Sequence, residues 1–285
     1  MKLSLLCCTL GDRPEELERM LAALEPGPHS VELIVVDQSA EARARSLVMA
    51  HAHRFEVKFV QCRPGLSRAR NVGLEHVTGD VLAFPDDDCW YRPDTIARAL
   101  AHFESDPTLD VLSGRWVDEH GEPCGHPWPP AATAIDANNV WRTAISFTLF
   151  VRTRAASGLR FDPLVGVGSG TLIGAGEETL YLLGLLERGA VARYVPDVEV
   201  RHPWRGVSSI PAAKAYRYAV GFGYVVREVK YPPSFVLPRL VAPLARGVAS
   251  GMSLDFAAAK YHFASGFGRA VGVLFGKQLA ARATP

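Results

Sequence analysis

Short apolar runs alternate along the chain with segments of helical periodicity. Strands are predicted at residues 3–9, 31–37, 57–61, 80–84, 111–117, 145–151 and 191–200. Helices are predicted at residues 14–24, 40–52, 66–76 and 177–188. This alternation is typical of an α/β protein with a mostly parallel central sheet flanked by helices.

The remaining segments read as loops until the chain changes character near residue 210. Residues 123–130 are rich in proline and aromatic residues, and residues 166–176 contain five glycines. Both segments predict loops. From residue 210 onward, aromatic residues and scattered basic residues indicate helices. We therefore expect an α/β domain over residues 1–209 and a helical extension over residues 210–285.

Acidic residues follow two of the predicted strands. Asp37 closes the strand at 31–37, and Asp86, Asp87 and Asp88 follow the strand at 80–84. Ligands of open α/β sheets bind outside the carboxyl ends of the strands, so these acids should meet at one edge. Alternate residues of an extended segment share a face, so Asp86 and Asp88 should point together and Asp87 elsewhere. Oxygen ligands suit Mg²⁺ or Mn²⁺, although acidic runs also form solvated turns.

Four segments in this order resemble the family 2 glycosyltransferases of the GT-A fold. They are residues 33–39 (LIVVDQS), 65–74 (GLSRARNVGL), 80–88 (DVLAFPDDD) and 161–179, which include Gly-Glu-Glu-Thr at 176–179. The resemblance spans about residues 3–202. It implies an inverting transfer of a sugar from a nucleotide-diphosphate sugar, with UDP as the default nucleotide. The acceptor would be a carbohydrate, a lipid-linked molecule or a small molecule, as in cell-envelope, exopolysaccharide or secondary-metabolite glycosylation.

The resemblance also implies roles for individual residues. The nucleotide would lie against Thr9, Asp37, Arg68, Asn71, Asp86 and Asp87. Mn²⁺ or Mg²⁺ would be held by Asp86, Asp88 and His202. The base that takes the acceptor proton would be Glu178 or its neighbour Glu177, which stand where the family usually has Glu-Asp.

Each of these residues also has a purely structural explanation. A strand-end Asp37 often makes a turn, Arg68 fits a solvated helix face, and Asn71 fits a bond that fixes its own loop. His202 follows a strand, where a lone histidine is often structural, and acidic residues favour the first turn of a helix. The pattern alone leaves these alternatives open.

The net charge of +1 hides an asymmetry. Residues 210–285 hold ten Lys/Arg against two Asp/Glu, which leaves 21 basic and 28 acidic residues before them. Two explanations of this basic, aromatic segment stay open: a peripheral contact with the inner face of the cell membrane, or helices that pack on the catalytic body. An acidic cleft would repel phosphates without a metal, which argues against nucleic acid as a partner.

The five cysteines, an odd number without metal-type spacing, favour a reducing, cytoplasmic location. Two other functions compete with glycosyl transfer. A nucleotidyltransferase would need a glycine-rich phosphate loop after the first strand, where residues 9–13 read TLGDR. A non-catalytic nucleotide-sugar or carbohydrate-binding module would keep the acids without needing a base.

Overall fold

The computed structural model describes residues 1–281, and the chain divides into two compact units. The first unit comprises Met1–Pro64, Arg68–Phe161 and Tyr181–Trp204. The second comprises Gly65–Ser67, Asp162–Leu180 and the chain from Arg205 onward. The predicted domain boundary between residues 209 and 210 stays a prediction.

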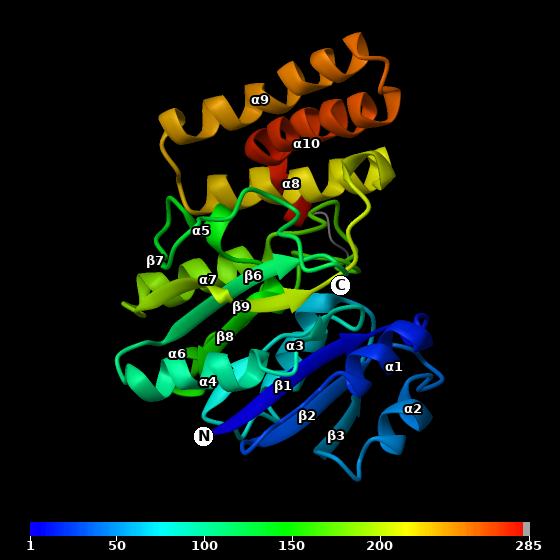
Figure 1. The fold of residues 1–285 in the computed structure, drawn as a ribbon. Helices are drawn as coiled ribbons and strands as arrows, with labels where there is room; N and C mark the ends of the chain where they lie inside the picture. Colours follow the sequence, from blue (N-terminus) through cyan, green and yellow to red (C-terminus); the bar gives the residue numbers. More distant parts are fainter. Residues whose placement is uncertain (282–285) are drawn as a thin grey trace. The chain divides into compact units, whose positions relative to one another are not determined.

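A nine-stranded sheet forms the centre of the first unit, with strand order β3-β2-β1-β4-β8-β6-β9-β5 and β7 paired to β9 (Figure 1). Its strands are β1 (Lys2–Thr9), β2 (Ser30–Asp37), β3 (Glu56–Gln61), β4 (Val81–Ala83), β5 (Trp90–Tyr91), β6 (Val111–Val117), β7 (Thr133–Ala134), β8 (Leu149–Arg152) and β9 (Ala192–Arg201). Strands β3, β2, β1 and β4 are parallel, and β8 is antiparallel to both β4 and β6. The sheet is therefore mixed, and the predicted α/β class is confirmed.

Helices connect these strands. They are α1 (Pro14–Ala22), α2 (Arg45–Ala50), α3 (Leu66–Leu74), α4 (Thr95–Ser105), α5 (Val140–Thr143), α6 (Thr153–Ala156) and α7 (Glu177–Glu187). The helix predicted at 40–52 is wrong in length, because Ala42 has a φ of 53° that does not belong to a right-handed helix. The strand predicted at 145–151 begins only at Leu149, because Ser146–Thr148 form a 3₁₀ turn.

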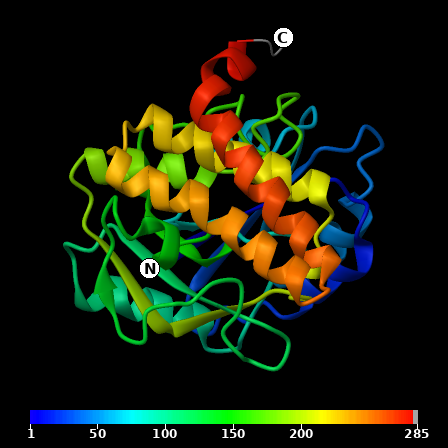
Figure 2. The same ribbon diagram turned by 90° about the horizontal axis from the view of Figure 1, so that it is seen from above.

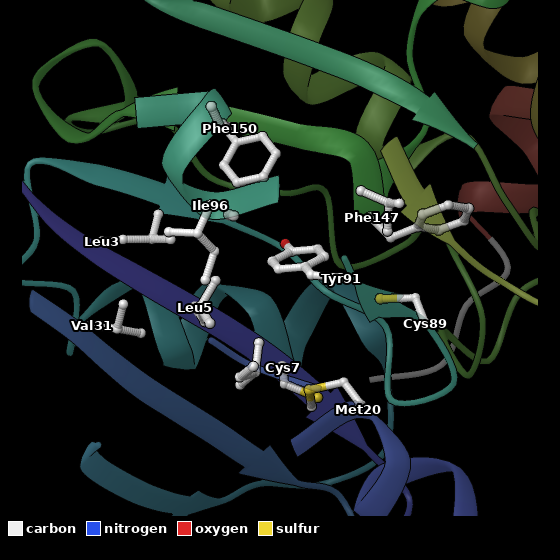
Figure 3. Close-up of a cluster of buried hydrophobic side chains, with 14 of the residues drawn as sticks. Leu3, Leu5, Cys7, Met20, Val31, Cys89, Tyr91, Ile96, Phe147 and Phe150 are labelled. Carbon is white, nitrogen blue, oxygen red and sulfur yellow. The ribbon is translucent and has the colours of Figure 1, made fainter. Parts of the chain in front are cut away.

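The apolar core of the first unit lies along β1. Leu3, Leu5 and Cys7 alternate along this strand, and Figure 3 shows them beside Tyr91 and Ile96. Strand β1 has a paired strand at each edge, and side chains on both of its faces are buried. This explains why its sequence reads as a continuous apolar run, and it fixes the strand ends at which the acids lie.

The second unit contains the long helices α8 (Ala212–Glu228), α9 (Pro233–Met252) and α10 (Phe256–Ala281), where the sequence predicts helices. Helix α10 packs against both α8 and α9 (Figure 2). The contact between α8 and α10 is closest at Gly223, Gly268 and Gly272, where an added Cβ atom would lie 2.2–2.4 Å from a backbone oxygen of the opposite helix. Among residues 1–281, no helix combines the length and the apolarity needed to cross a bilayer.

Candidate active site

The predicted strand-end acids meet at one edge of the sheet. Thr9 and Asp37 are register partners at the carboxyl ends of β1 and β2, and Cys8 pairs with Asp86 in an isolated parallel bridge. The carboxyl end of β1 therefore lies between Asp37 and the acidic segment that follows β4. This is the arrangement that the parallel pairing predicts.

Asp86 and Asp88 point to the same side, together with His202 from the end of β9. One ligand atom from each of the three residues lies within 4.8 Å of the others. The Nε2 atom of His202 is 3.2 Å from Oδ1 of Asp88, and a guanidinium nitrogen of Arg70 is 3.6 Å from Oδ1 of Asp86. All three side chains of the group are partly exposed, so an ion from solvent can reach them.

The ring of His202 is held from two directions. Its Nδ1 atom lies 2.9 Å from the carbonyl oxygen of Pro203, so this nitrogen carries a proton and donates to the carbonyl. The ring stacks on Phe147 with 4.9 Å between centroids and meets the edge of Trp116. Nε2 is thus the nitrogen directed at the carboxylates. Two carboxylates and an imidazole whose second nitrogen is bound to a carbonyl form a donor set that fits Mn²⁺ or Mg²⁺.

Burial and charge compete at the Asp88–His202 pair. Burial raises the pKa of Asp88, but the hydrogen bond and charge of His202, with Arg13, outweigh it and leave the pKa below its ordinary value. Burial lowers the pKa of His202, but its hydrogen bond to Asp88 outweighs this and leaves the pKa raised. The pair therefore favours a charged carboxylate beside a protonated imidazole, and a metal ion would replace that imidazole proton.

Asp87 points away from this group, as predicted. Its side chain is only 3% exposed, accepts a 2.7 Å hydrogen bond from the hydroxyl of Thr9, and pairs with Arg13. Burial raises the pKa of Asp87 to about 6, although the Thr9 hydroxyl and the Arg13 charge act in the opposite direction. Thr9 also accepts a bond from the backbone N–H of Gly11. Thr9 and Asp87 thus tie the end of β1 to the acidic segment.

The other predicted nucleotide residues make bonds within the protein. The two carboxylate oxygens of Asp37 accept backbone N–H groups of Ser39 at 2.7 Å and Ala44 at 2.9 Å. Arg68 is exposed and donates to the carbonyl of Pro64, and Asn71 bonds both the N–H and the C=O of Phe161 at 2.8 Å. The bonds of Asp37 match the turn expected for it, whereas Asn71 lies on α3 and bonds a residue 90 positions away instead of fixing its own loop. Contact of these residues with a nucleotide stays a prediction.

The two candidate bases begin helix α7 within the second unit. Glu177 is buried and Glu178 is half-buried. Gly166 approaches Glu177 so closely that an added Cβ atom would lie 3.1 Å from a carboxylate oxygen, and its φ of 105° also favours glycine. Of the two carboxylates, Glu178 is therefore the one that solvent can reach.

Comparison with known proteins identifies the family. The model of the glycosyl transferase family 2 matches residues 8–157, which include the end of β1, Asp37 and the acidic segment. The chain belongs to glycosyl transferase family 2. The resemblance in the sequence is thus confirmed, and the chain is a glycosyltransferase.

Relatives of this glycosyltransferase differ in how much of it they match. It is 29% identical to the succinoglycan biosynthesis protein ExoM of Rhizobium meliloti over 264 residues, which cover 88% of this chain and 79% of ExoM. It is 30% identical to the amylovoran biosynthesis glycosyltransferase AmsE of Erwinia amylovora over 118 residues, which cover 39% of this chain and 44% of AmsE.

Solved structures share the fold of this glycosyltransferase. Residues 1–349 of Staphylococcus aureus TarS match with a TM-score of 0.62 and 14% identity, and the match covers 95% of this chain and 91% of that 1–349 chain. The mannosyltransferase PcManGT of Pyrobaculum calidifontis, in complex with GDP-Man and Mn²⁺, matches with a TM-score of 0.60 and 20% identity. The match covers 99% of this chain and 76% of the PcManGT chain. At these identities the matches establish the GT-A fold of the chain.

Arg13 of this glycosyltransferase was not among the predicted site residues. It precedes α1, and its guanidinium bridges Asp87 and Asp88. The paired acids lie about 75 positions away in sequence, so no local pattern could have revealed the contact. In the structure Arg13 supplies a positive charge to the same carboxylate, Asp88, that a metal would need.

Proposed function

We propose that the protein transfers a sugar from a nucleotide-diphosphate sugar to an acceptor hydroxyl with inversion at the anomeric carbon, and that it depends on Mn²⁺ or Mg²⁺. The observation that carries this proposal is the group of Asp86, Asp88 and His202 at the carboxyl edge of the sheet. A family 2 glycosyltransferase with this donor set has the ligands needed to grip a cation and, through it, a diphosphate.

Asp86, Asp88 and His202 would hold the cation. When bound, a divalent cation neutralises the charge that develops on the diphosphate leaving group. Asp87 has a different task, because its bonds to Thr9 and Arg13 orient the acidic segment on β1. The carbonyl of Pro203 fixes the tautomer of His202, so the cluster is organised before any ligand arrives.

Glu178 is the proposed base. It would accept the proton of the acceptor hydroxyl while that oxygen attacks the sugar on the face opposite the leaving diphosphate, which inverts the anomeric carbon. Glu178 is half-buried, whereas Glu177 is buried beside the loop at Gly166. The exposure of the two carboxylates therefore favours Glu178.

The relatives support a donor class and a role for the enzyme. Solved structures with this fold contain UDP-GlcNAc in TarS and GDP-Man in PcManGT. ExoM and AmsE are named for the biosynthesis of succinoglycan and amylovoran. We therefore propose UDP- or GDP-sugars as donors, with UDP favoured by the family, and a growing exopolysaccharide, free or lipid-linked, as acceptor. A cytoplasmic location stays a prediction.

Calorimetry with Mn²⁺ and a panel of nucleotide sugars tests the metal site. The double substitution Asp86→Asn/Asp88→Asn should weaken Mn²⁺ binding at least about tenfold, because it removes both carboxylate ligands. Asp197→Asn, at a half-exposed carboxylate on β9, is the control and should leave binding unchanged. Equal donor binding in chelator and in the double variant would end the metal proposal.

Turnover of the donor identified by calorimetry tests the base. Glu178→Gln should lower kcat by roughly 10²–10⁴-fold while donor binding stays the same, and Glu177→Gln is the matched control. Full activity of the Glu178 variant would remove this residue from the mechanism. NMR of the product should show the anomeric configuration opposite to that of the donor, and retention would contradict direct attack.

A further inference from the structure

The turn between α9 and α10 carries three of the most exposed apolar side chains of the described chain. Met252 is 81% exposed, Leu254 is 74% exposed and Phe256 is 62% exposed. Asp255, the acid in this turn, is engaged internally, since it accepts the N–H of Ala258 in the first turn of α10 and the hydroxyl of Ser208. The turn is therefore an ordered apolar tip.

Both helices continue the apolar tip along one face. Exposed apolar residues recur at helical spacing, at Val241, Val248 and Met252 on α9 and at Phe256 and Phe267 on α10. We call Val241, Val248, Met252, Leu254, Phe256 and Phe267 the hairpin face.

The side of α9 that packs against α10 is not the side that carries the hairpin face. There, Pro243 and Gly247 are buried, and Gly247 lies against Phe263 of α10. On α9 the hairpin face is thus separate from the contact with α10. Exposed apolar side chains that recur at helical spacing on two packed helices are unusual on a monomer unless they meet a partner.

The charges around the hairpin face suit an anionic partner. Residues 210–285 hold ten Lys/Arg against two Asp/Glu. Exposed Lys260 lies one helical turn after Phe256 on the same side of α10. An apolar stripe with aromatic residues and flanking cations is the pattern of helices that lie in a lipid interface.

We infer that the hairpin face docks on an anionic lipid bilayer, with the turn at Leu254 inserted between headgroups and with Lys260 near lipid phosphates. This docking does not depend on the metal or on the base. If the proposed glycosyl transfer is correct, it would also bring the enzyme to the surface where lipid-linked acceptors lie.

Vesicle co-sedimentation of the full chain tests the inference. Wild-type protein should bind vesicles of phosphatidylcholine and phosphatidylglycerol and bind pure phosphatidylcholine more weakly. The triple substitution Met252→Gln/Leu254→Gln/Phe256→Gln should weaken binding by roughly tenfold or more, because it removes the side chains that insert. Met49→Gln, at a half-exposed methionine on α2, is the matched control and should bind like wild type.

A second pair of variants tests the charges. Lys260→Glu should weaken binding to the anionic vesicles, whereas Arg98→Glu on α4 should not. Light scattering after size-exclusion chromatography measures the oligomeric state and so tests the alternative that a second copy of the chain covers the hairpin face. Unchanged vesicle binding of the triple variant, no vesicle binding by wild type, or a wild-type dimer that the triple variant abolishes would each overturn the inference. None of these results would affect the metal and turnover tests.

Discussion

The substitution Gly272→Ala should separate two helices that pack backbone to backbone. A Cβ atom at this position of α10 would lie 2.2 Å from the carbonyl oxygen of Val220 and 2.8 Å from both Cα of Gly223 and N of Tyr224 on α8. All three obstacles are backbone atoms, so no rotamer change can relieve the overlap. The helices must move apart by roughly an ångström before the contact becomes normal.

Two effects of opposite sign set the magnitude. Alanine is a better helix former than glycine, which favours the variant by about 1 kcal/mol. Overpacking of a tight contact typically costs about 1–3 kcal/mol, and the upper part of that range applies when backbone must move. We expect a net loss of about 1–2 kcal/mol in the free energy of unfolding.

Gly251→Ala is the matched control, because Gly251 also lies in a helix, α9, but nothing lies within 4 Å of a Cβ atom there. The Gly251→Ala substitution should raise the free energy of unfolding by up to about 1 kcal/mol. Thermal unfolding of the two variants beside wild type should show a lower Tm for Gly272→Ala and an unchanged or higher Tm for Gly251→Ala. If the Gly272 variant were as stable as the Gly251 variant, the α8–α10 contact would not be as close as described.

Three further outcomes are expected. Burial raises the pKa of Glu32, but hydroxyl and ammonium donors outweigh burial and hold this pKa well below its ordinary value. The charged Glu32 therefore stabilises the fold above pH ~4.3, and this stabilisation is lost as the pH falls further. Glu32→Gln should lower the Tm at pH 7 and make the Tm fall less steeply in acid. Arg13→Gln should tighten Mn²⁺ binding in the absence of nucleotide by up to about fivefold, because a half-exposed ion pair such as Arg13–Asp88 contributes about 1 kcal/mol or less. Weaker Mn²⁺ binding by this variant in a calorimetric titration would contradict a competition between Arg13 and the metal for Asp88. Asn71→Ala leaves two backbone groups of Phe161 without their bonds, so the free energy of unfolding in urea should fall by roughly 2–4 kcal/mol, and a loss under 0.5 kcal/mol would contradict it.

The sequence predicted the frame of the first unit because buried strands carry a strong local signal. The apolar runs at residues 3–9 and 31–37 correspond to β1 and β2, which are buried on both faces. The positions of the acids followed from the same logic, since parallel strands end at one edge. By contrast, α4 was not among the predicted elements, although Ile96, Leu100 and Phe103 are buried at helical spacing.

Contacts between distant residues could not be predicted in this way. Arg13 reads as a solvated residue before a helix, and only the fold brings it to Asp87 and Asp88. The helix–helix contact at Gly272 depends on Gly223 in another helix. From the sequence alone, a glycine within a helix predicts only a less stable helix, because the facing residue that requires glycine is not known. Local patterns predict elements and strand ends, whereas pairing requires coordinates.

The three consecutive aspartates show how one tight turn assigns different tasks to identical side chains. The sequence predicted an extended segment here, but residues 86–89 form a turn closed by a 3.2 Å bond from the N–H of Cys89 to the carbonyl oxygen of Asp86. Within this turn Asp86 and Asp88 face His202 while Asp87 faces Thr9. Three carboxylates on one side would repel each other strongly. Because Asp87 is turned inward and neutralised by Arg13, the outward pair can remain charged, and the segment can attract a cation without losing its own attachment to β1.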